Sequence, residues 1–168
     1  MRSYKQNNIP PRDRYNRPIS DLRVSLLDQC NFRCTYCMPE REFHSEYQFL
    51  KKHQRLSHEE IFRIVKIAVE LGVTKVRLTG GEPLLDKNIS KLINLISQVE
   101  EIEDLALTTN GVLLRKHAND MMKAGLHRIT ISLDSIDEVI FNKMNGNRAS
   151  VREVLDGIEA AENAGFDK

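Results

Sequence analysis

Four short strand-like stretches alternate with helical stretches along most of this chain, and this order constrains its fold more than any other feature. The strands are expected at residues 22–26, 73–79, 105–109 and 128–134. Strands that are joined through helices pair in parallel, with right-handed crossovers. The order therefore predicts an α/β fold that is built on a parallel sheet.

The expected helices have clear start and stop signals. Residues 57–60 form a capping box, and the apolar helical pattern that follows ends at Gly72. A second capping box at residues 150–153 begins a helix that runs to Ala164, and Ser135 is expected to cap a short helix. Apolar residues at helical spacing predict two more helices, over residues 89–99 and 114–122.

The expected strands alternate between polar and apolar residues, although buried parallel strands normally read as continuous apolar runs. The apolar residues must face the helices, so the other face borders a lumen. That face carries Arg23, Ser25, Arg77, Thr79, Ala106, Thr108, Thr130, Ser132 and Asp134. An unpaired buried charge is costly, so the pattern favours a cavity for a polar, anionic ligand. The alternative is a half-exposed sheet edge or polar fringe.

All three cysteines lie in one CxxxCxxC stretch, at Cys30, Cys34 and Cys37, directly after the first expected strand. An odd number of clustered cysteines indicates metal or redox chemistry rather than a disulfide framework. Three thiolates can bind three irons of a 4Fe-4S cluster and leave the fourth iron open. A zinc site completed by His44 or His53 and a group of inert buried cysteines are the alternatives.

The composition excludes several classes of function. The chain has 168 residues and a net charge of +1, which gives no bias toward nucleic acid or a membrane surface. No stretch is long and apolar enough to span a bilayer, and the first residues lack the pattern of a signal peptide, so we expect a cytoplasmic protein. Residues 1–21 are expected to form an N-terminal arm and residues 22–168 one core domain.

Two of these motifs together resemble the radical S-adenosylmethionine (SAM) superfamily. They are the cysteine stretch with Tyr36 before its last cysteine, and Gly80-Gly81-Glu82-Pro83 after the second strand. Within that superfamily, the chain from about Asp13 onward resembles the MoaA family, the GTP 3′,8-cyclases of molybdenum-cofactor biosynthesis. The segments that carry this resemblance are 21–25, 28–39, 76–84, 107–111 and 131–134.

The resemblance implies a partial (β/α) barrel, of which this chain holds about four of an expected six units, and a ligand for each motif residue. Cys30, Cys34 and Cys37 would bind one 4Fe-4S cluster. SAM would be bound by Tyr36, Gly81 and Ser132, and GTP by Arg23, Arg77 and Thr108. No catalytic residue is implied beyond the cluster and SAM.

The implied reaction is a radical cyclisation. One electron from a donor such as a flavodoxin or a ferredoxin cleaves SAM to methionine and a 5′-deoxyadenosyl radical. The radical takes a hydrogen from the GTP ribose, and cyclisation onto the guanine gives (8S)-3′,8-cyclo-7,8-dihydroguanosine 5′-triphosphate. A homodimer is left open by the sequence.

Other interpretations remain open at this point. MoaA relatives continue for about as many residues again and hold a second cluster there, so we expect this chain to be a fragment or a truncated product. A different substrate and a non-catalytic cluster-binding fragment are the alternative functions. Arg23 and Arg77 are alternatively structural partners of Asp134 and Glu82, and Tyr36 only packs over the cluster. Asn16 stands where the family commonly has glycine.

Overall fold

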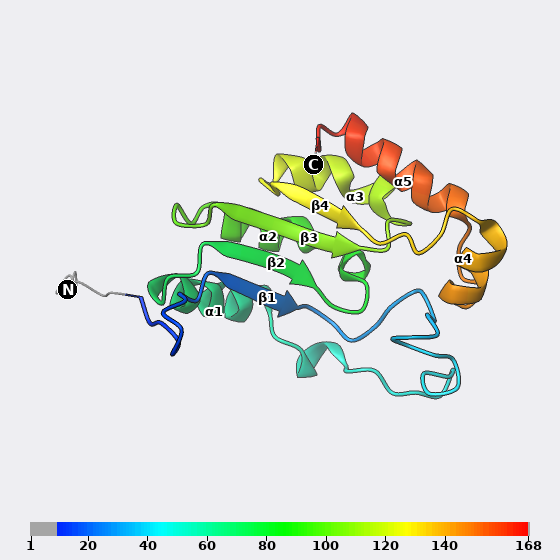
Figure 1. Cartoon of the computed structure of the whole chain (residues 1–168), viewed down its shortest axis with the longest axis horizontal. Helices are drawn as coiled ribbons and strands as arrows, with labels where there is room; N and C mark the ends of the chain where they lie inside the picture. The colour runs from blue at the N-terminus through cyan, green and yellow to red at the C-terminus, as the bar shows by residue number, and fades with distance from the viewer. Residues whose placement is uncertain (1–9, 168) are drawn as a thin grey trace.

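The computed structural model describes residues 10–167 and contains one parallel sheet (Figure 1). Its strands are β1 (Asp21–Ser25), β2 (Lys75–Thr79), β3 (Asp104–Thr109) and β4 (Arg128–Ile131), in the order β1-β2-β3-β4. The parallel α/β prediction is therefore confirmed. The first nine residues of the expected arm, and Lys168 of the expected core domain, lie outside the described residues.

Most of the helices form a layer on one face of the sheet, and the helix over residues 138–145 lies beyond the carboxyl ends of the strands (Figure 1). The helices are α1 (His58–Glu70), α2 (Ile89–Ser97), α3 (Leu114–Lys123), α4 (Glu138–Asn145) and α5 (Val151–Asn163), with short 3-10 turns η1 (Lys52–Gln54) and η2 (Pro83–Leu85). Neighbouring helices contact one another in the order α1, α2, α3 and α5. None of the helices within residues 10–167 is long and apolar enough to cross a membrane.

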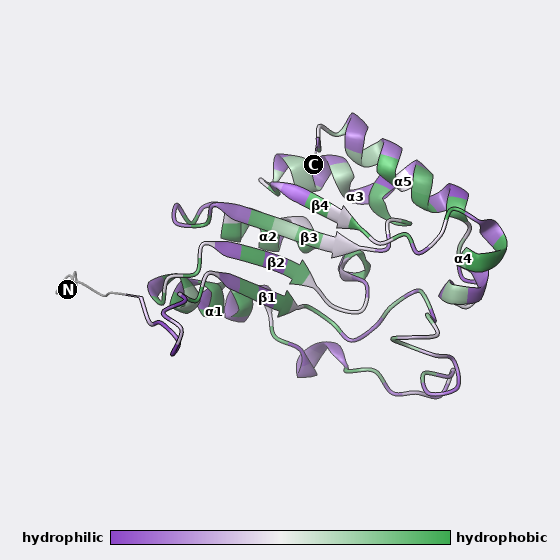
Figure 2. Ribbon diagram, in the orientation of Figure 1, coloured by the Kyte–Doolittle hydropathy of each residue, from purple (hydrophilic) through white to green (hydrophobic). Residues whose placement is uncertain are grey.

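The apolar residues of the strands and helices meet in one core between the sheet and the helix layer. Hydrophobic and hydrophilic residues alternate along the strands, as expected for a sheet with two different faces (Figure 2). The side chains that are completely buried include Val65, Leu78, Ile89, Leu92, Ile93, Ile96, Leu105, Leu107, Leu114 and Met121. Within residues 10–167, no helix packs on the opposite face of the sheet, where a site can therefore lie (Figure 1).

Both predicted capping boxes are present. Ser57 and Glu60 exchange hydrogen bonds at the start of α1, and Ser150 and Glu153 do the same at the start of α5. The predicted cap at Ser135 is wrong, because the side chain of Asp137 accepts from the first amides of α4 and the Ser135 hydroxyl accepts from the Asp137 amide.

The end of the fourth strand also differs from the prediction. β4 ends at Ile131, so Ser132 and Asp134 lie just beyond it rather than inside the strand. In the expected arm, Arg12 pairs with Pro18 across a turn that the Asp13 carboxylate closes. Asn16 occupies the left-handed region of this turn, at φ 63°. Asparagine tolerates that region better than most residues, so it can replace a glycine there.

Candidate active site

The cysteine loop lies where the parallel strands end, beside the loops that follow β2 and β3. Gly81 donates its amide to the Leu27 carbonyl at 2.7 Å, and the Glu82 amide donates to the Gln29 carbonyl at 2.8 Å. A Cβ atom at Gly81 would overlap the Gln29 carbonyl oxygen. The glycine is thus required for backbone packing against the cysteine loop, which is a physical reason for it besides the SAM contact that the resemblance implies.

Glu82 fixes the end of β3 to this loop. It is 1% exposed and accepts hydrogen bonds from the Thr109 hydroxyl at 2.6 Å and from the Asn110 amide at 2.8 Å. Burial raises the pKa of the Glu82 carboxyl, while these hydrogen bonds act in the opposite direction. Both carboxylate oxygens of Glu82 therefore accept hydrogen bonds from the end of β3 and the loop after it. The alternative that Glu82 pairs with Arg77 is wrong.

Asn110 connects the β3 loop to the cysteine loop. Its side-chain amide donates to the Asn31 side-chain oxygen at 2.8 Å and lies 4.0 Å from the Cys30 Sγ. The sequence indicated only that Asn110 and Gly111 end a strand. The role of the Asn110 side chain could not be predicted, because its partner Asn31 lies 79 positions away in the chain.

Arg33 shapes the cysteine loop from within. Its guanidinium donates to the carbonyls of Cys30 and Phe32 at 2.9 and 2.8 Å, and to the carbonyl of Phe43 at 2.9 Å. A buried guanidinium can satisfy several carbonyls at once because it has five donors in a fixed plane. Arg33 thus holds the shape of the cysteine loop, a role that the motifs did not indicate.

A second, smaller apolar cluster anchors the cysteine loop to the end of the chain. Phe32 and Cys34 are buried against Phe141 of α4 and Val154 of α5. The rings of Phe32 and Phe141 meet edge to face, with their centroids 6.1 Å apart. The loop is therefore held by packing that does not depend on a bound metal.

The three thiols differ in exposure and are all free. Cys34 is buried, Cys30 is partly buried and Cys37 is exposed. Burial and the neighbouring thiols of Cys37 and Cys30 raise the pKa of Cys34 to about 12, and burial also raises the pKa of Cys30. Both thiols are therefore protonated at neutral pH unless a metal cation replaces the proton.

This donor set fits an iron-sulfur cube better than a single ion. Among residues 10–167, no group of three or more Cys, His, Asp or Glu side chains is placed to hold one metal ion. The zinc alternative with His44 or His53 therefore finds no support. A cube presents a different iron to each thiolate, so three soft ligands spread over one loop can bind it without meeting at a point.

Tyr36 reaches from the cysteine loop to the end of β4. Its hydroxyl lies 3.2 Å from both carboxylate oxygens of Asp134. Ser132, two residues earlier, donates its amide to the Thr109 carbonyl at 2.9 Å, which brings it close to the ends of β3 and β4. Burial raises the pKa of Tyr36, and the neighbouring Cys34 and Asp134 add to this effect.

Tyr36 and Ser132, two of the residues predicted to bind SAM, thus lie near the end of β4 that faces the cysteine loop. Because Asp134 is engaged with Tyr36, the alternative that Asp134 pairs with Arg23 is wrong. Among the described residues, neither Arg23 nor Arg77 has a carboxylate oxygen within 4.0 Å.

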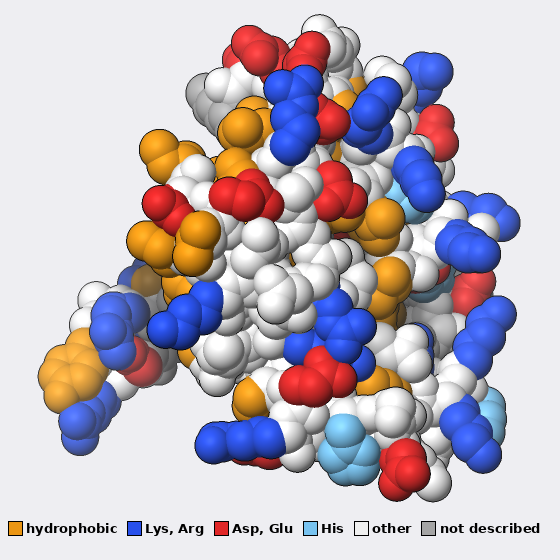
Figure 3. All heavy atoms as spheres, turned by 90° about the vertical axis from the view of Figure 1, so that its right-hand side faces the viewer, with side chains coloured by type: hydrophobic (Ala, Val, Ile, Leu, Met, Phe, Trp, Pro, Cys, Tyr) orange, Lys and Arg blue, Asp and Glu red, His pale blue; other side chains and the backbone are white. Residues whose placement is uncertain are grey.

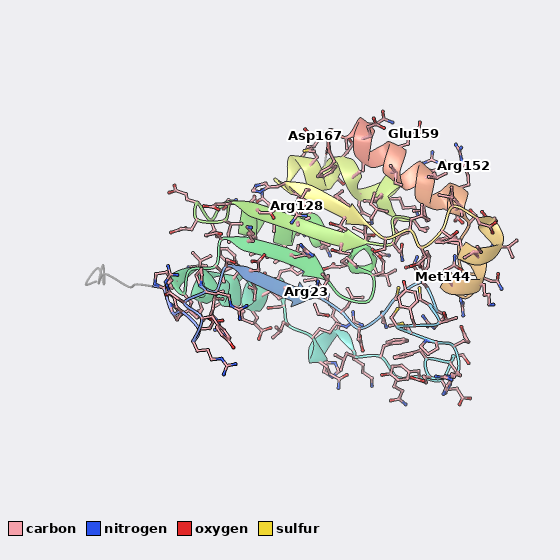
Figure 4. The ribbon with its side chains drawn as sticks, in the orientation of Figure 1. Arg23, Arg128, Met144, Arg152, Glu159 and Asp167 are labelled. Carbon is pink, nitrogen blue, oxygen red and sulfur yellow. The ribbon has the colours of Figure 1, made fainter. Side chains whose placement is uncertain are left out.

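The open face of the sheet carries a row of arginines. Arg23 is opposite Arg77 in the strand register, Arg77 is opposite Ala106, and Ala106 is opposite Arg128. Figure 4 labels two of these residues, Arg23 on β1 and Arg128 on β4. Three guanidiniums therefore project from one row of the open face, as the alternation predicted for Arg23 and Arg77. The prediction did not include Arg128, although it lies two residues before Thr130 on the same strand and therefore points to the same face.

A row of hydroxyls lies between the arginines and the cysteine loop. Ser25 is opposite Thr79, and Thr108 is opposite Thr130. Each of these four residues lies two positions further along its strand than the residue of the arginine row on the same strand, and this row consists of Arg23, Arg77, Ala106 and Arg128. The strands end on the face that is turned to the viewer in Figure 3, where acidic, basic and hydrophobic side chains are interspersed. The predicted polar stripe is confirmed, with its cationic part further from the cysteines than its hydroxyl part.

Comparison with known proteins agrees with this arrangement. The family model described as "Radical SAM superfamily" matches residues 24–168. The chain is 51% identical over 159 residues to a GTP 3′,8-cyclase of Xanthomonas campestris pv. campestris (strain B100), covering 95% of this chain and 47% of the relative. It is 47% identical over 155 residues to a GTP 3′,8-cyclase of Staphylococcus epidermidis, covering 92% of this chain and 46% of the relative.

Solved structures share the fold. Methylornithine synthase (PylB) superposes with a TM-score of 0.68 at 19% identity, over 89% of this chain and 43% of that one. Streptococcus suis SuiB bound to S-adenosylmethionine superposes with a TM-score of 0.69 at 19% identity, over 89% of this chain and 32% of that one.

The chain belongs to the radical SAM superfamily. This family implies a 4Fe-4S cluster and SAM as cofactors, and the partial (β/α) barrel expected from the sequence is confirmed. The resemblance to GTP 3′,8-cyclases is also confirmed, and the chain spans about half the length of the curated relatives that it matches.

Proposed function

We propose that this chain carries the radical-generating part of a GTP 3′,8-cyclase, a lyase of molybdenum-cofactor biosynthesis. One observation supports this most strongly: the open face of one parallel sheet carries a row of arginines, then a row of hydroxyls, and the three-cysteine loop lies beyond them at the carboxyl ends of the strands. Similarity to two GTP 3′,8-cyclases at 51% and 47% identity agrees with it.

Each group of residues has its own task in this proposal. Cys30, Cys34 and Cys37 bind one 4Fe-4S cluster. When bound, the cluster and SAM supply the electron and the 5′-deoxyadenosyl radical. SAM is bound by Tyr36, Gly81 and Ser132, and the Asp134 carboxylate orients the Tyr36 hydroxyl.

The substrate has a defined orientation across the open face. Arg23 and Arg77 can each offer paired donors to phosphate oxygens, and Thr108 lies one step nearer the cysteine loop. The triphosphate of GTP therefore binds toward the amino ends of the strands, and its ribose lies toward the cysteine loop. This orientation brings the ribose hydrogens to the side where the radical forms.

The remaining partners follow from the chemistry. Cys37 is the exposed thiol of the three, so an electron donor such as a flavodoxin or a ferredoxin approaches from its side. Free clustered thiols and an oxygen-sensitive cofactor suit the reducing cytoplasm. A second cluster belongs to the additional length that the relatives have.

A radical SAM enzyme with another phosphorylated substrate is the second candidate. The arginine row recognises phosphates but not a base, so the open face alone does not select guanine. Titrating the chain with GTP, ATP and inorganic tripolyphosphate compares the contributions of the base and the phosphates.

Replacing Arg77 with alanine is expected to weaken GTP binding about tenfold, because one charge-assisted pair of hydrogen bonds is lost. Isothermal calorimetry on the whole chain measures this change, and thermal melting shows that the fold is retained. Arg115→Ala, which removes an exposed arginine of α3, is the matched control and should leave the affinity unchanged. An unaltered GTP affinity in Arg77→Ala would show that the arginine row is structural.

A further inference from the structure

The amino-terminal part of the open face contains a charged cavity of about 180 Å³. Two residues before the arginine row on each strand, the register places Asp21 opposite Lys75 and Lys75 opposite Asp104. The cavity is therefore lined by four cations and two carboxylates, which are Arg23, Lys75, Arg77, Arg128, Asp21 and Asp104. The excess of positive charge suits an anionic ligand.

One of these cations, Arg128, already forms an ion pair with Asp104. Arg128 donates from Nε to Asp104 Oδ1 at 2.8 Å and from Nη2 to Asp104 Oδ2 at 2.7 Å. The hydrogen bond from Arg128 lowers the pKa of Asp104. Two N–H groups of the guanidinium are thus committed to a carboxylate and are not available to a phosphate.

Residues of the two outer strands line the same cavity. Asp21 on β1 and Arg128 on β4 both line it, although two strands lie between them. Ala106, between Arg77 and Arg128 in the register, contributes only a methyl group. No long side chain therefore separates Arg77 from Arg128 in this row, and both line the same cavity.

We propose that Asp104 is a specificity-determining residue, because it holds Arg128 and so limits to two the guanidiniums that offer paired donors to phosphate. This inference rests on the proposed function, since the ligand is the polyphosphate part of the substrate. With Arg128 held, charge alone does not dominate binding, and contacts to the rest of the nucleotide contribute to selection.

The test uses inorganic tripolyphosphate, which contains only the charged part of the ligand. Calorimetric titration of the whole chain should show that Asp104→Asn binds tripolyphosphate about tenfold more tightly, because Arg128 is released. The double variant Asp104→Asn/Arg128→Ala has the same net charge in the cavity as the wild type and should bind tripolyphosphate within about twofold of it, because no guanidinium is released.

Two controls accompany this comparison. Asp156→Asn breaks an ion pair of the same 2.7 Å length with Arg152 on α5, away from the cavity, and should leave tripolyphosphate binding unchanged. Arg128→Ala alone leaves the Asp104 carboxylate unpaired in the cavity and should weaken tripolyphosphate binding, because the carboxylate then repels the anion. This second variant keeps the test decisive where Asp104→Asn does not fold.

Several outcomes would overturn the inference. They are no gain from Asp104→Asn, an equal gain in the double variant, tighter binding by Arg128→Ala, or no binding of tripolyphosphate to the wild-type chain. If Arg77→Ala weakens GTP binding while the variants of Asp104 and Arg128 behave in one of the first three ways, only this inference fails. If Arg77→Ala also has no effect, the open face is not the phosphate site.

Discussion

A Cys34→Ser chain that is reconstituted anaerobically with iron and sulfide is expected to remain colourless, while the wild-type chain turns brown. The wild type should bind about four irons per chain and the variant close to none, because a hard hydroxyl does not replace a soft thiolate. Cys34 is the central and most buried of the three thiols. Iron analysis and the visible absorbance spectrum measure the difference.

The matched control is the double variant His44→Ala and His53→Ala. Both histidines lie in the long loop after the cysteines, where zinc binding would use one of them and a three-cysteine cube would not. The control should keep its full iron content. Wild-type iron content in Cys34→Ser, or loss of metal in the histidine variant, would refute the three-cysteine ligand set.

Gly81→Ala is expected to have the second largest effect. The added methyl group overlaps the Gln29 carbonyl oxygen, so the β2 loop must move away from the cysteine loop. That movement weakens the hydrogen bonds from Gly81 to Leu27 and from Glu82 to Gln29. Overpacking together with weakened hydrogen bonds costs about 3 kcal/mol, which lowers the Tm by about 6–12 °C.

The same substitution should also reduce iron uptake, because the added methyl group presses on Gln29, which directly precedes Cys30. Gly165→Ala is the control for the general effect of losing a glycine. The added methyl at Gly165 meets only the end of Met122, but the positive φ costs about 1–2 kcal/mol. This control should melt somewhat earlier and still take up iron fully. Normal iron uptake by Gly81→Ala would show that the loop contact does not support the cluster.

The sequence was sufficient to predict the parts of the fold that depend on local pattern. The capping boxes at Ser57 and Ser150 are set by residues three positions apart. The two faces of the sheet follow from alternation, so Arg23 and Arg77 could be placed on the open face before their register was known. The cysteine loop could be placed at a strand end because CxxxCxxC directly follows a strand.

The features that were missed depend on contacts between distant residues. Glu82 was considered as a partner of an arginine, but it is buried where the ends of β2 and β3 meet, 27 positions from Thr109. The pair of Asp104 and Arg128 forms only because parallel pairing brings β3 and β4 together. Local spacing contains no information about such pairs.

The misplaced helix start has a different cause. Ser135 and Asp137 are both good capping residues, and only the path of the chain after β4 decides between them. The role of Arg33 was equally hidden, because arginine is usually an exposed residue and its hydrogen bonds to the carbonyls of Cys30, Phe32 and Phe43 leave no trace in the side-chain pattern.

The most direct test of the central claim is the cleavage of SAM by the reconstituted chain. With an intact cluster, SAM and a strong reductant, the wild-type chain should form 5′-deoxyadenosine, and Cys34→Ser should form none. Chromatography of the quenched reaction, with a reductant-free control, measures the product. Reductant-dependent 5′-deoxyadenosine is the result we expect, and a chain with a full complement of iron that forms none would contradict the assignment of radical chemistry to this site.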